Sequence, residues 1–389
     1  MSGLAGRAAI VGIGATEFSK RSGRTPLQLA VEASQAALQD AGLSAADVDG
    51  METFTGDQNA ETDVARCLGI PRLKHFARIH YGGGAACAVV QEAAMAVATG
   101  VANVVVCYRA FNERSERRFG AGRQGSSADV PVPMPTNWYA PFGLVTPGSW
   151  VAMFAQRYMH EYGATSEDFG RIAVADRKHA ATNPKAWFYE RPITLEDHQS
   201  SRWIVEPLHL LDCCQESDGG VALVVTSVER ARDLPNPPTV IRGAAQGASY
   251  DQETMTSYYR DEIGGLPEMG LVGEQLWEMS GLTADDIQTA VFYDHFTPFV
   301  LTQLEELGFC KRGEARHFIA DGAIELGGRL PINTNGGQLG EAYIHGINGI
   351  AEAVRQVRGT AVNQVDDVEH VLVTAGTGVP TSGLILGRA

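Results

Sequence analysis

The chain carries its most informative segment at 336–349, which reads Gly-Gly-Gln-Leu-Gly-Glu-Ala-Tyr-Ile-His-Gly-Ile-Asn-Gly. Its paired glycines precede a run of small residues that predicts a helix, and an apolar strand is expected over 368–374. The first part of the chain has the same order, with glycines at 82–84, a small-residue helix and an apolar strand over 101–107. This repetition indicates two similar halves.

A second pair of matching segments supports the duplication. Residues 40–49 read Asp-Ala-Gly-Leu-Ser-Ala-Ala-Asp-Val-Asp, and residues 279–288 read Met-Ser-Gly-Leu-Thr-Ala-Asp-Asp-Ile-Gln. Each segment follows an amphipathic helical pattern and precedes a strand pattern. The alternation of apolar strands with helices predicts two α/β units with mixed, mainly parallel sheets.

The boundary between the halves is expected in the proline-rich stretch 233–239, because its prolines cannot continue a helix. The predicted domains are therefore 1–235 and 236–389. Residues 108–149 interrupt the strand and helix rhythm with arginines, glycines, prolines and aromatics. This stretch is predicted to be a long functional loop region inserted in the first half.

Composition narrows the class of protein. The formal net charge of −15 disfavours nucleic acid and anionic lipid as partners, and no apolar run approaches the ~20 residues of a membrane span. The first residues lack the pattern of a secretory signal, so a cytoplasmic protein is expected. The six cysteines show no Cys-x-x-Cys spacing, which predicts buried thiols and neither a disulfide framework nor a metal site.

Several separated landmarks resemble the thiolase superfamily across essentially the whole chain, and its sterol-carrier-protein or lipid-transfer branch most. They are the opening Ala-Ile-Val-Gly-Ile-Gly-Ala-Thr-Glu-Phe (9–18), Leu-Leu-Asp-Cys-Cys-Gln-Glu-Ser-Asp-Gly-Gly-Val-Ala (210–222), Phe-Tyr-Asp-His-Phe-Thr (292–297) and the final Ala-Gly-Thr-Gly turn. The resemblance implies a five-layer α/β fold, in which two duplicated halves with mixed sheets sandwich helices. It also implies an acyl-CoA substrate.

The chemical positions of the family are altered in this chain. The resemblance puts Tyr81 at the nucleophilic cysteine, Tyr293 at one family histidine and Tyr343 at the other, and it leaves no thiol near 374–376. Cys87 falls nearly two helical turns beyond the nucleophile position, so it is expected in the core. Residues near the expected oxyanion region are further site candidates, namely Tyr81, Gly82, Asp294, His295, His345 and Gly376.

Two hypotheses follow from these changes. The chain is either a degenerate thiolase that binds or carries lipids, or an enzyme whose tyrosines replace the lost groups. Both histidine positions hold the same proton-carrying residue, which favours catalysis by Tyr293 and Tyr343. Without a nucleophile, thiolysis loses its covalent intermediate, whereas retro-aldol cleavage of a β-hydroxyacyl-CoA needs only acid and base. The residues leave open which tyrosine is the base.

The two tyrosines also resemble those of the lipid-transfer-protein-like aldolases of bacterial steroid side-chain degradation. That resemblance implies cleavage of a steroid CoA ester with a tertiary hydroxyl to a 17-keto steroid and propionyl-CoA. It further implies a homodimer and a small partner protein with an OB-fold and a zinc ribbon, which would carry any zinc. No cofactor is expected on this chain, because CoA is part of the substrate.

An arginine-rich stretch begins at Arg109 in the otherwise acidic chain. One interpretation is a solvated surface with ion pairs, and the other is contact with the CoA phosphates, because guanidinium binds phosphate through two hydrogen bonds. The candidates for the phosphate contact are Arg117, Arg118 and Arg123. Trp138, Tyr139 and Phe142 are candidates for the wall of an apolar steroid cavity.

Overall fold

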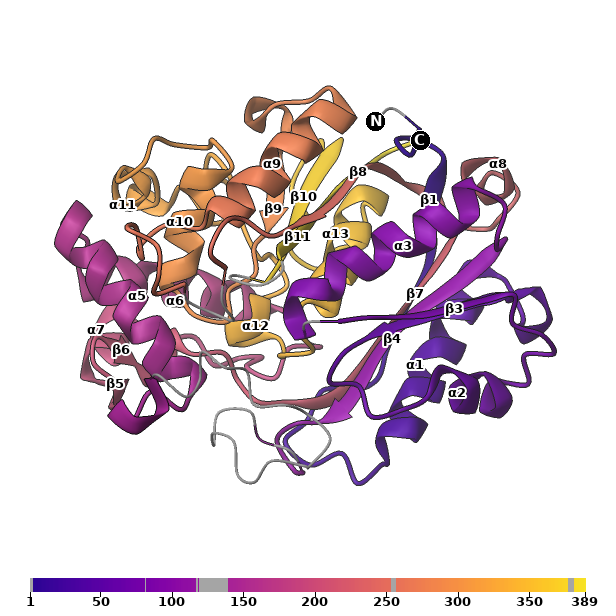
Figure 1. The fold of residues 1–389 in the computed structure, drawn as a ribbon, viewed down its shortest axis with the longest axis horizontal. Helices are drawn as coiled ribbons and strands as arrows, with labels where there is room; N and C mark the ends of the chain where they lie inside the picture. The colour runs from indigo at the N-terminus through magenta and orange to yellow at the C-terminus, as the bar shows by residue number, and fades with distance from the viewer. Residues whose placement is uncertain (1–2, 81, 117, 119–138, 253–256, 377–380) are drawn as a thin grey trace.

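A computed structural model describes residues 3–80, 82–116, 118, 139–252, 257–376 and 381–389 (Figure 1). Its main sheet has nine strands in the order β3-β2-β4-β7-β1-β8-β11-β10-β9. The strands are β1 (Ala8–Ala15), β2 (Gly50–Phe54), β3 (His75–Ile79), β4 (Val104–Asn112), β7 (Asp218–Ser227), β8 (Thr239–Gly247), β9 (Thr289–Val291), β10 (His370–Ala375) and β11 (Thr381–Gly387). A separate hairpin pairs β5 (Trp203–Val205) with β6 (Leu208–His209).

Some helices cover the two faces of this sheet, and others pack beside it. They are α1 (Pro26–Ala41), α2 (Glu61–Leu68), α3 (Ala86–Ala98), α5 (Pro147–Tyr162), α6 (Ser166–Thr182), α7 (Leu195–Ser200), α8 (Val228–Ala231), α9 (Pro267–Ser280), α10 (Pro298–Glu306), α11 (Ala315–Phe318), α12 (Gly337–Gly340) and α13 (Ile347–Arg358). In the described residues, no helix has the length and apolar character that a membrane span requires.

The duplication is visible in the strand order. In the first half the neighbours run β2-β4-β7-β1, and in the second half they run β9-β10-β11-β8 with the same directions: parallel, antiparallel, antiparallel. The two matching sequence segments also fold alike, because each forms a short 3₁₀ turn, 45–47 and 284–286, closed by an aspartate. Asp47 accepts a hydrogen bond from the N–H of Ser44 at 3.0 Å, and Asp286 accepts one from Thr283 at 2.8 Å.

The halves meet at one short contact between strands. Strands β1 and β8 pair through Ala9 with Val240 and Ile10 with Thr239, which makes the sheet continuous. The predicted boundary at 235/236 falls between α8 and β8, and the division into two domains stays a prediction. The sheet is mixed, as expected, but the expectation of mainly parallel pairing was wrong: among the described strands only β2–β3, β2–β4 and β9–β10 are parallel.

Helices α3 and α13 form the central layer, because each contacts strands of both halves. Helix α1 covers the outer face of the first half, and α9 covers that of the second half (Figure 1). This arrangement gives the five alternating layers that the resemblance implied. The small residues of α3 let the two half-sheets approach closely, and nine of its thirteen residues are buried.

The predicted loop region was only partly correct. Strand β4 continues through Asn112, so 108–112 are strand and are buried on both faces of the sheet. At the other end, α5 begins at Pro147 with Thr146 as its cap. Residues 117 and 119–138 lie outside the described residues.

Candidate active site

Two tyrosines from different parts of the second half meet in the interior. Tyr293 follows β9, and Tyr343 lies between α12 and α13. Their hydroxyl oxygens are 3.2 Å apart, and their ring centres are 6.4 Å apart in an edge-to-face arrangement. Tyr293 is only 3% exposed, while Tyr343 is partly buried. The structure therefore brings together the two residues that the sequence singled out as catalytic candidates.

Hydrogen bonds to neighbouring elements hold the backbone of Tyr293. Its N–H donates to Oγ1 of Thr374 on β10 at 2.9 Å, and its carbonyl accepts from Nε2 of Gln303 on α10 at 3.0 Å. Thr374 also donates to Oε1 of Gln303 at 2.5 Å, so the three residues form a closed buried network. The backbone that carries this phenol therefore has little freedom to move.

Glycine backbones enclose the ring of Tyr293. A Cβ atom at Gly83 would lie 1.7 Å from the Tyr293 hydroxyl, and one at Gly346, whose φ is +86°, would lie 2.9 Å from the ring. Gly83 belongs to the 3₁₀ turn before α3, and Gly346 precedes α13. Both central helices thus begin at this phenol, and a side chain at either glycine would displace it.

Tyr343 is positioned by contacts from three other segments. Its N–H donates to Oγ of Ser217 at 3.2 Å, and its ring packs edge-on against His345 at 4.7 Å. His345 in turn stacks on Phe111 of β4 at 4.8 Å, and its Nδ1 accepts a hydrogen bond from Arg109 of the same strand. The first half therefore supplies the support for a phenol of the second half.

Burial controls the protonation of the pair. It raises the pKa of Tyr293 and of Tyr343 well above that of a free phenol. The hydrogen bond from Tyr343 and the charge of Arg109 act in the opposite direction on Tyr293, whereas Cys214 and Glu113 raise its pKa further. At neutral pH the pair therefore rests as neutral phenols, which can donate a proton. Only the tyrosinate form can accept one, and a nearby positive charge favours that form.

Family models match both halves of the chain. The model described as "Thiolase, N-terminal domain" matches residues 8–229, and "Thiolase C-terminal domain-like" matches residues 251–388. The chain belongs to the thiolase family. Its α/β fold with helices between two half-sheets agrees with this assignment.

Three similar proteins carry descriptions that bear on the chemistry. The chain is 73% identical to a "Steroid side-chain-cleaving aldolase" of Thermomonospora curvata, with 100% of this chain and 99% of the relative covered. It is 70% identical to a "17-hydroxy-3-oxo-4-pregnene-20-carboxyl-CoA lyase" of Mycobacterium tuberculosis, with 99% and 100% covered. A solved "Ltp2-ChsH2(DUF35) aldolase" matches with a TM-score of 0.95 and 72% identity, with 100% of this chain and 99% of that chain covered.

Among the described residues, no thiol takes the place of the nucleophilic cysteine of a thiolase. Tyr81, at the nucleophile position, lies outside the described residues, and its neighbour Gly82 has a φ of +54°. Cys87 is fully buried in α3, its Sγ lies 3.9 Å from the carbonyl of Val373, and burial raises the pKa of its thiol. A thiol that is buried and protonated cannot attack a thioester.

The remaining predicted site residues support the segments that carry the tyrosines. Asp294 is fully buried and accepts hydrogen bonds from the N–H groups of Gln338 at 2.9 Å and Leu339 at 3.1 Å, which fixes α12 just before Tyr343. His295 stacks on Phe299 at 5.3 Å, and burial lowers its pKa to about 3, so its ring is neutral. Buried Gly376, with a φ of +73°, follows β10.

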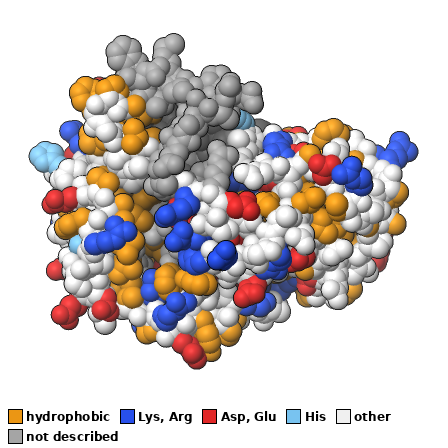
Figure 2. Space-filling model, turned by 90° about the horizontal axis from the view of Figure 1, so that it is seen from below, with side chains coloured by type: hydrophobic (Ala, Val, Ile, Leu, Met, Phe, Trp, Pro, Cys, Tyr) orange, Lys and Arg blue, Asp and Glu red, His pale blue; other side chains and the backbone are white. Residues whose placement is uncertain are grey.

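Only one of the phosphate candidates can be placed. Arg118 pairs with Glu216 at 2.6 Å, while Arg117 and Arg123 lie outside the described residues. Arg114 also faces Glu216, at 4.0 Å, so the described part of the stretch forms ion pairs with an acidic neighbour. On the face of the molecule that Figure 2 shows, lysine and arginine side chains lie with acidic side chains among them. Arg109, by contrast, is fully buried and cannot reach a CoA phosphate.

Two of the aromatic candidates for a cavity wall, Tyr139 and Phe142, lie among the described residues. Trp138 lies outside the described residues, and Phe142 is 83% exposed. The ring of Tyr139 packs against Trp150 at 6.0 Å and Tyr258 at 5.6 Å. Of these candidates, only Tyr139 has described aromatic packing, and it lies at the start of a short 3₁₀ turn rather than beside the tyrosine pair.

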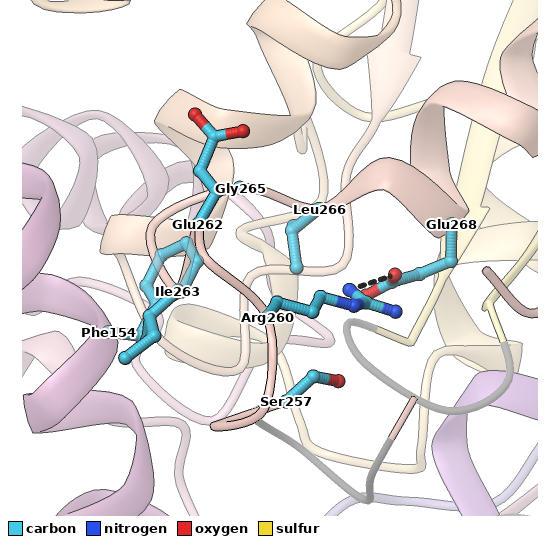
Figure 3. Close-up of a pocket in the computed structure, with 8 residues that line it drawn as sticks. All are labelled: Phe154, Ser257, Arg260, Glu262, Ile263, Gly265, Leu266 and Glu268. Atoms are coloured by element: carbon cyan, nitrogen blue, oxygen red, sulfur yellow. Dashed lines mark hydrogen bonds and ion pairs between the residues drawn. The ribbon is translucent and has the colours of Figure 1, made fainter. Parts of the chain in front are cut away.

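Two cavities lie apart from the tyrosine pair. The smaller, about 10 Å³, has room for at most a single water and contains the buried ion pair of Arg260 and Glu268 at 2.7 Å (Figure 3). The larger is a groove of about 800 Å³, lined by residues after β1, by the segment near Trp187 and by Arg355 and Arg358 of α13. Neither Tyr293 nor Tyr343 lines either cavity.

Sequence reasoning missed several residues that position the pair. They are Arg109, Phe111, Glu113, Cys214, Ser217, Gln303 and Thr374. Their contacts join segments that are far apart along the chain, so spacing gave no direct signal. The conspicuous segment 210–222, already singled out as a landmark, could have pointed to Cys214 and Ser217.

Proposed function

We propose that this chain is a carbon–carbon lyase that cleaves a steroid β-hydroxyacyl-CoA by a retro-aldol reaction, giving a 17-keto steroid and propionyl-CoA. The observation that carries the proposal is the direct contact of the Tyr293 and Tyr343 hydroxyls at 3.2 Å. The resemblance puts these two residues at the positions of two thiolase histidines. The names of the two relatives at 73% and 70% identity support the choice of reaction and substrate.

The proposed reaction needs one base and one acid. The base removes the proton of the tertiary hydroxyl, and the electrons of that O–H bond form the ketone carbonyl. The bond between the carbinol carbon and the α-carbon breaks, and its electrons form the enolate of propionyl-CoA. The acid then gives the enolate carbon a proton, so the reaction is balanced without an oxidant or a second substrate. One tyrosinate and one neutral phenol in hydrogen-bond contact can supply both transfers: the tyrosinate accepts the hydroxyl proton, and the neutral phenol gives its proton to the enolate carbon.

A panel of substrates tests this proposal against its alternatives. The purified chain with its partner protein is mixed with a steroid β-hydroxyacyl-CoA, or with a 3-ketoacyl-CoA and free CoA, and products are identified by mass spectrometry. We expect cleavage of the hydroxyacyl-CoA without added CoA. Cleavage of only the ketoacyl-CoA would indicate a thiolase, and recovery of both ligands unchanged would indicate the lipid carrier.

A second copy of the chain is the proposed partner at the edge of the sheet. Strand β3 is the terminal strand, and among the described strands nothing pairs with its outer edge. The opposite edge is covered, because Ala290 of β9 exchanges backbone hydrogen bonds with Pro331 and Asn333. Phe76 of β3 is 60% exposed. An open strand edge with an exposed apolar side chain favours pairing with a strand of another chain. We therefore assign homodimer formation to β3.

Substitution at this edge tests the homodimer. Phe76→Asp should halve the mass measured by analytical ultracentrifugation, because two such strands would place carboxylates against each other. Phe142→Asp is the matched control, since Phe142 is also exposed but lies away from the sheet edge. An unchanged mass for Phe76→Asp would refute the assignment.

The complex is also proposed to contain a small OB-fold and zinc-ribbon protein that carries the zinc, while this chain holds no cofactor. The description of the solved structure joins an aldolase with ChsH2(DUF35), which supports a heterocomplex. A cytoplasmic location is part of the same proposal. Co-purification of the two proteins at a fixed ratio is the expected result, and separate elution at micromolar concentration would contradict it.

A further inference from the structure

A fully buried arginine lies behind the tyrosine pair. Arg109 is 0% exposed, and its guanidinium donates to the carbonyl of Phe54 at 2.9 Å, to the carbonyl of Thr55 at 3.3 Å and to Nδ1 of His345. Its Cζ lies 4.6 Å from the ring centre of Phe54 and 4.8 Å from that of Phe111. Two rings and three acceptors thus fix the guanidinium in one place.

The contact with Arg109 determines the proton position on His345. An arginine has only donors, so the Nδ1 atom that it contacts must be unprotonated and accept. The neutral ring then carries its proton on Nε2. Burial, the charge of Arg109 and His295 together lower the pKa of His345 well below its usual value, which agrees with a neutral ring.

Packing on both sides fixes the orientation of the His345 ring. One face stacks on Phe111 at 4.8 Å, and Tyr343 meets the ring edge-on at 4.7 Å. The backbone of His345 has a φ of +50°, a left-handed conformation that is uncommon outside glycine but is adopted by asparagine, aspartate and histidine more often than by other residues. Its local preference and its contacts therefore act together at this position.

Arg109 is the positive charge that acts on the phenols. Burial lowers the pKa of Arg109 and is the largest effect, while the charge of Asp57 raises it. Interactions with Tyr343 and Tyr293 are smaller and also raise the pKa of Arg109. The groups that oppose tyrosinate formation are Cys214 and Glu113, together with burial. Burial also raises the pKa of Glu113, which favours its neutral carboxyl and so reduces its opposition to a tyrosinate.

Resting on the proposed lyase activity, we propose that Arg109 is a positioning residue for the tyrosine pair. Through His345 it orients Tyr343, and its buried charge stabilises the tyrosinate that accepts the substrate proton. The role gives this buried cation a function beyond its interaction with Asp57. It also explains how phenols that burial keeps neutral can supply a base at neutral pH.

Three variants separate this role from simple support of the fold. Arg109→Gln removes the charge, and Arg109→Lys keeps the charge but loses the fork that spans both carbonyls and His345. His345→Asn tolerates the positive φ and keeps an acceptor for Arg109, but removes the ring beside Tyr343. Arg358→Gln is the matched control, because the side chain of Arg358 is also largely buried and bonds Asp40 at 2.8 Å, at the large groove that neither tyrosine lines.

The first readout is the pH profile of kcat/KM for the complete complex. Loss of the cation makes the tyrosinate less stable, so the pKa of the activating base rises and activity appears only at higher pH. We expect Arg109→Gln to move the rising limb upward by at least about one pH unit and to lower kcat/KM at pH 7 at least about tenfold. Arg109→Lys should recover part of the loss, and Arg358→Gln should lower thermal stability without moving the limb.

The second readout needs no substrate. Tyrosinate absorbance is titrated in the wild type, in Tyr343→Phe and in Arg109→Gln. Burial places the titration of Tyr343 above that of the exposed tyrosines. Tyr343→Phe should therefore lose a late step of the titration, and that step should move to still higher pH in Arg109→Gln. Inactivity of the wild-type complex would refute the proposed function, while this titration would still decide the role of Arg109.

A lower stability of Arg109→Gln with an unchanged pH profile and unchanged titration would refute the inference, because it would leave Arg109 a purely structural residue. If the single variant does not fold, Arg109→Gln combined with Asp57→Asn removes both buried charges together and provides the same comparison.

Discussion

Removing either phenol oxygen at the site should abolish turnover while leaving the fold intact. Tyr293→Phe and Tyr343→Phe each delete one atom of the 3.2 Å hydroxyl contact and keep the ring that packs among buried neighbours. A lost hydrogen bond of this kind costs about 1 kcal/mol of stability. Loss of a general acid or base costs about 10² to 10⁴ in rate, equivalent to about 2.7 to 5.4 kcal/mol at the transition state. The effect on rate should therefore exceed the effect on folding.

The assay is steady-state cleavage of a steroid β-hydroxyacyl-CoA by the complex, with thermal unfolding measured on the same samples. Tyr158→Phe is the matched control, because its hydroxyl is also buried and donates to Glu305 at 2.5 Å, in a different core cluster. That control should lose stability but keep its rate. Near-normal rates in both Tyr293→Phe and Tyr343→Phe would refute the assignment of proton transfer to this pair.

Three further predictions concern other parts of the molecule. Cys87→Ser should retain most turnover, because the thiol is buried and protonated; a stoichiometric acyl-enzyme at Cys87 in mass spectra would contradict this. Gly83→Ala should lower kcat at least about tenfold, because its Cβ would lie 1.7 Å from the Tyr293 hydroxyl, and rates of the variant test this directly. Burial raises the pKa of Glu52 to about 9, so its contribution to stability is complete below about pH 4.5 and is lost as pH rises towards 9. Denaturant unfolding from pH 6 to 9 should therefore show Glu52→Gln gaining stability relative to the wild type, whereas exposed Glu32→Gln should show no such trend.

The duplication could be predicted because local sequence encodes it. The segments 40–49 and 279–288 carry the same turn chemistry, a serine or threonine followed three residues later by an aspartate, and both fold into the same capped turn. The tyrosine pair could be predicted because the resemblance supplied positions for both residues. The contact between the two tyrosines depends on tertiary structure. The family resemblance indicated both residues, whereas the periodicity of the sequence did not.

The function of the arginine stretch could not be predicted from spacing. Arg109 and Arg118 lie nine residues apart, yet one is fully buried in β4 and the other forms an ion pair at the surface. Side chains alternate along a strand, so Arg109 shares the inward side of β4 with Cys107 and Phe111. This alternation can be recognised in the sequence only once the strand is known to extend to Asn112. The burial of a charge there also contradicts the usual preference of arginine for the surface.

The expectation of mainly parallel pairing in the sheet was wrong for a related reason. The alternation of helices and strands predicts parallel neighbours, but β7 and β11 each enter between an earlier strand and β1 or β8 in the opposite direction. The position of a later strand in the centre of a half-sheet does not change the local preference of its residues for strand structure. Only the complete topology shows it.

The most direct test of the proposed reaction is whether the α-carbon of propionyl-CoA gains a hydrogen from solvent in deuterated water. The complex is incubated in D₂O with a steroid CoA ester that carries a β tertiary hydroxyl, and propionyl-CoA is analysed by mass spectrometry. Because an enolate must be reprotonated by a group in exchange with solvent, we predict cleavage to the ketone and propionyl-CoA with one deuterium on the α-carbon. Complete inertness of the properly assembled complex towards this ester would contradict the retro-aldol account and leave the lipid carrier.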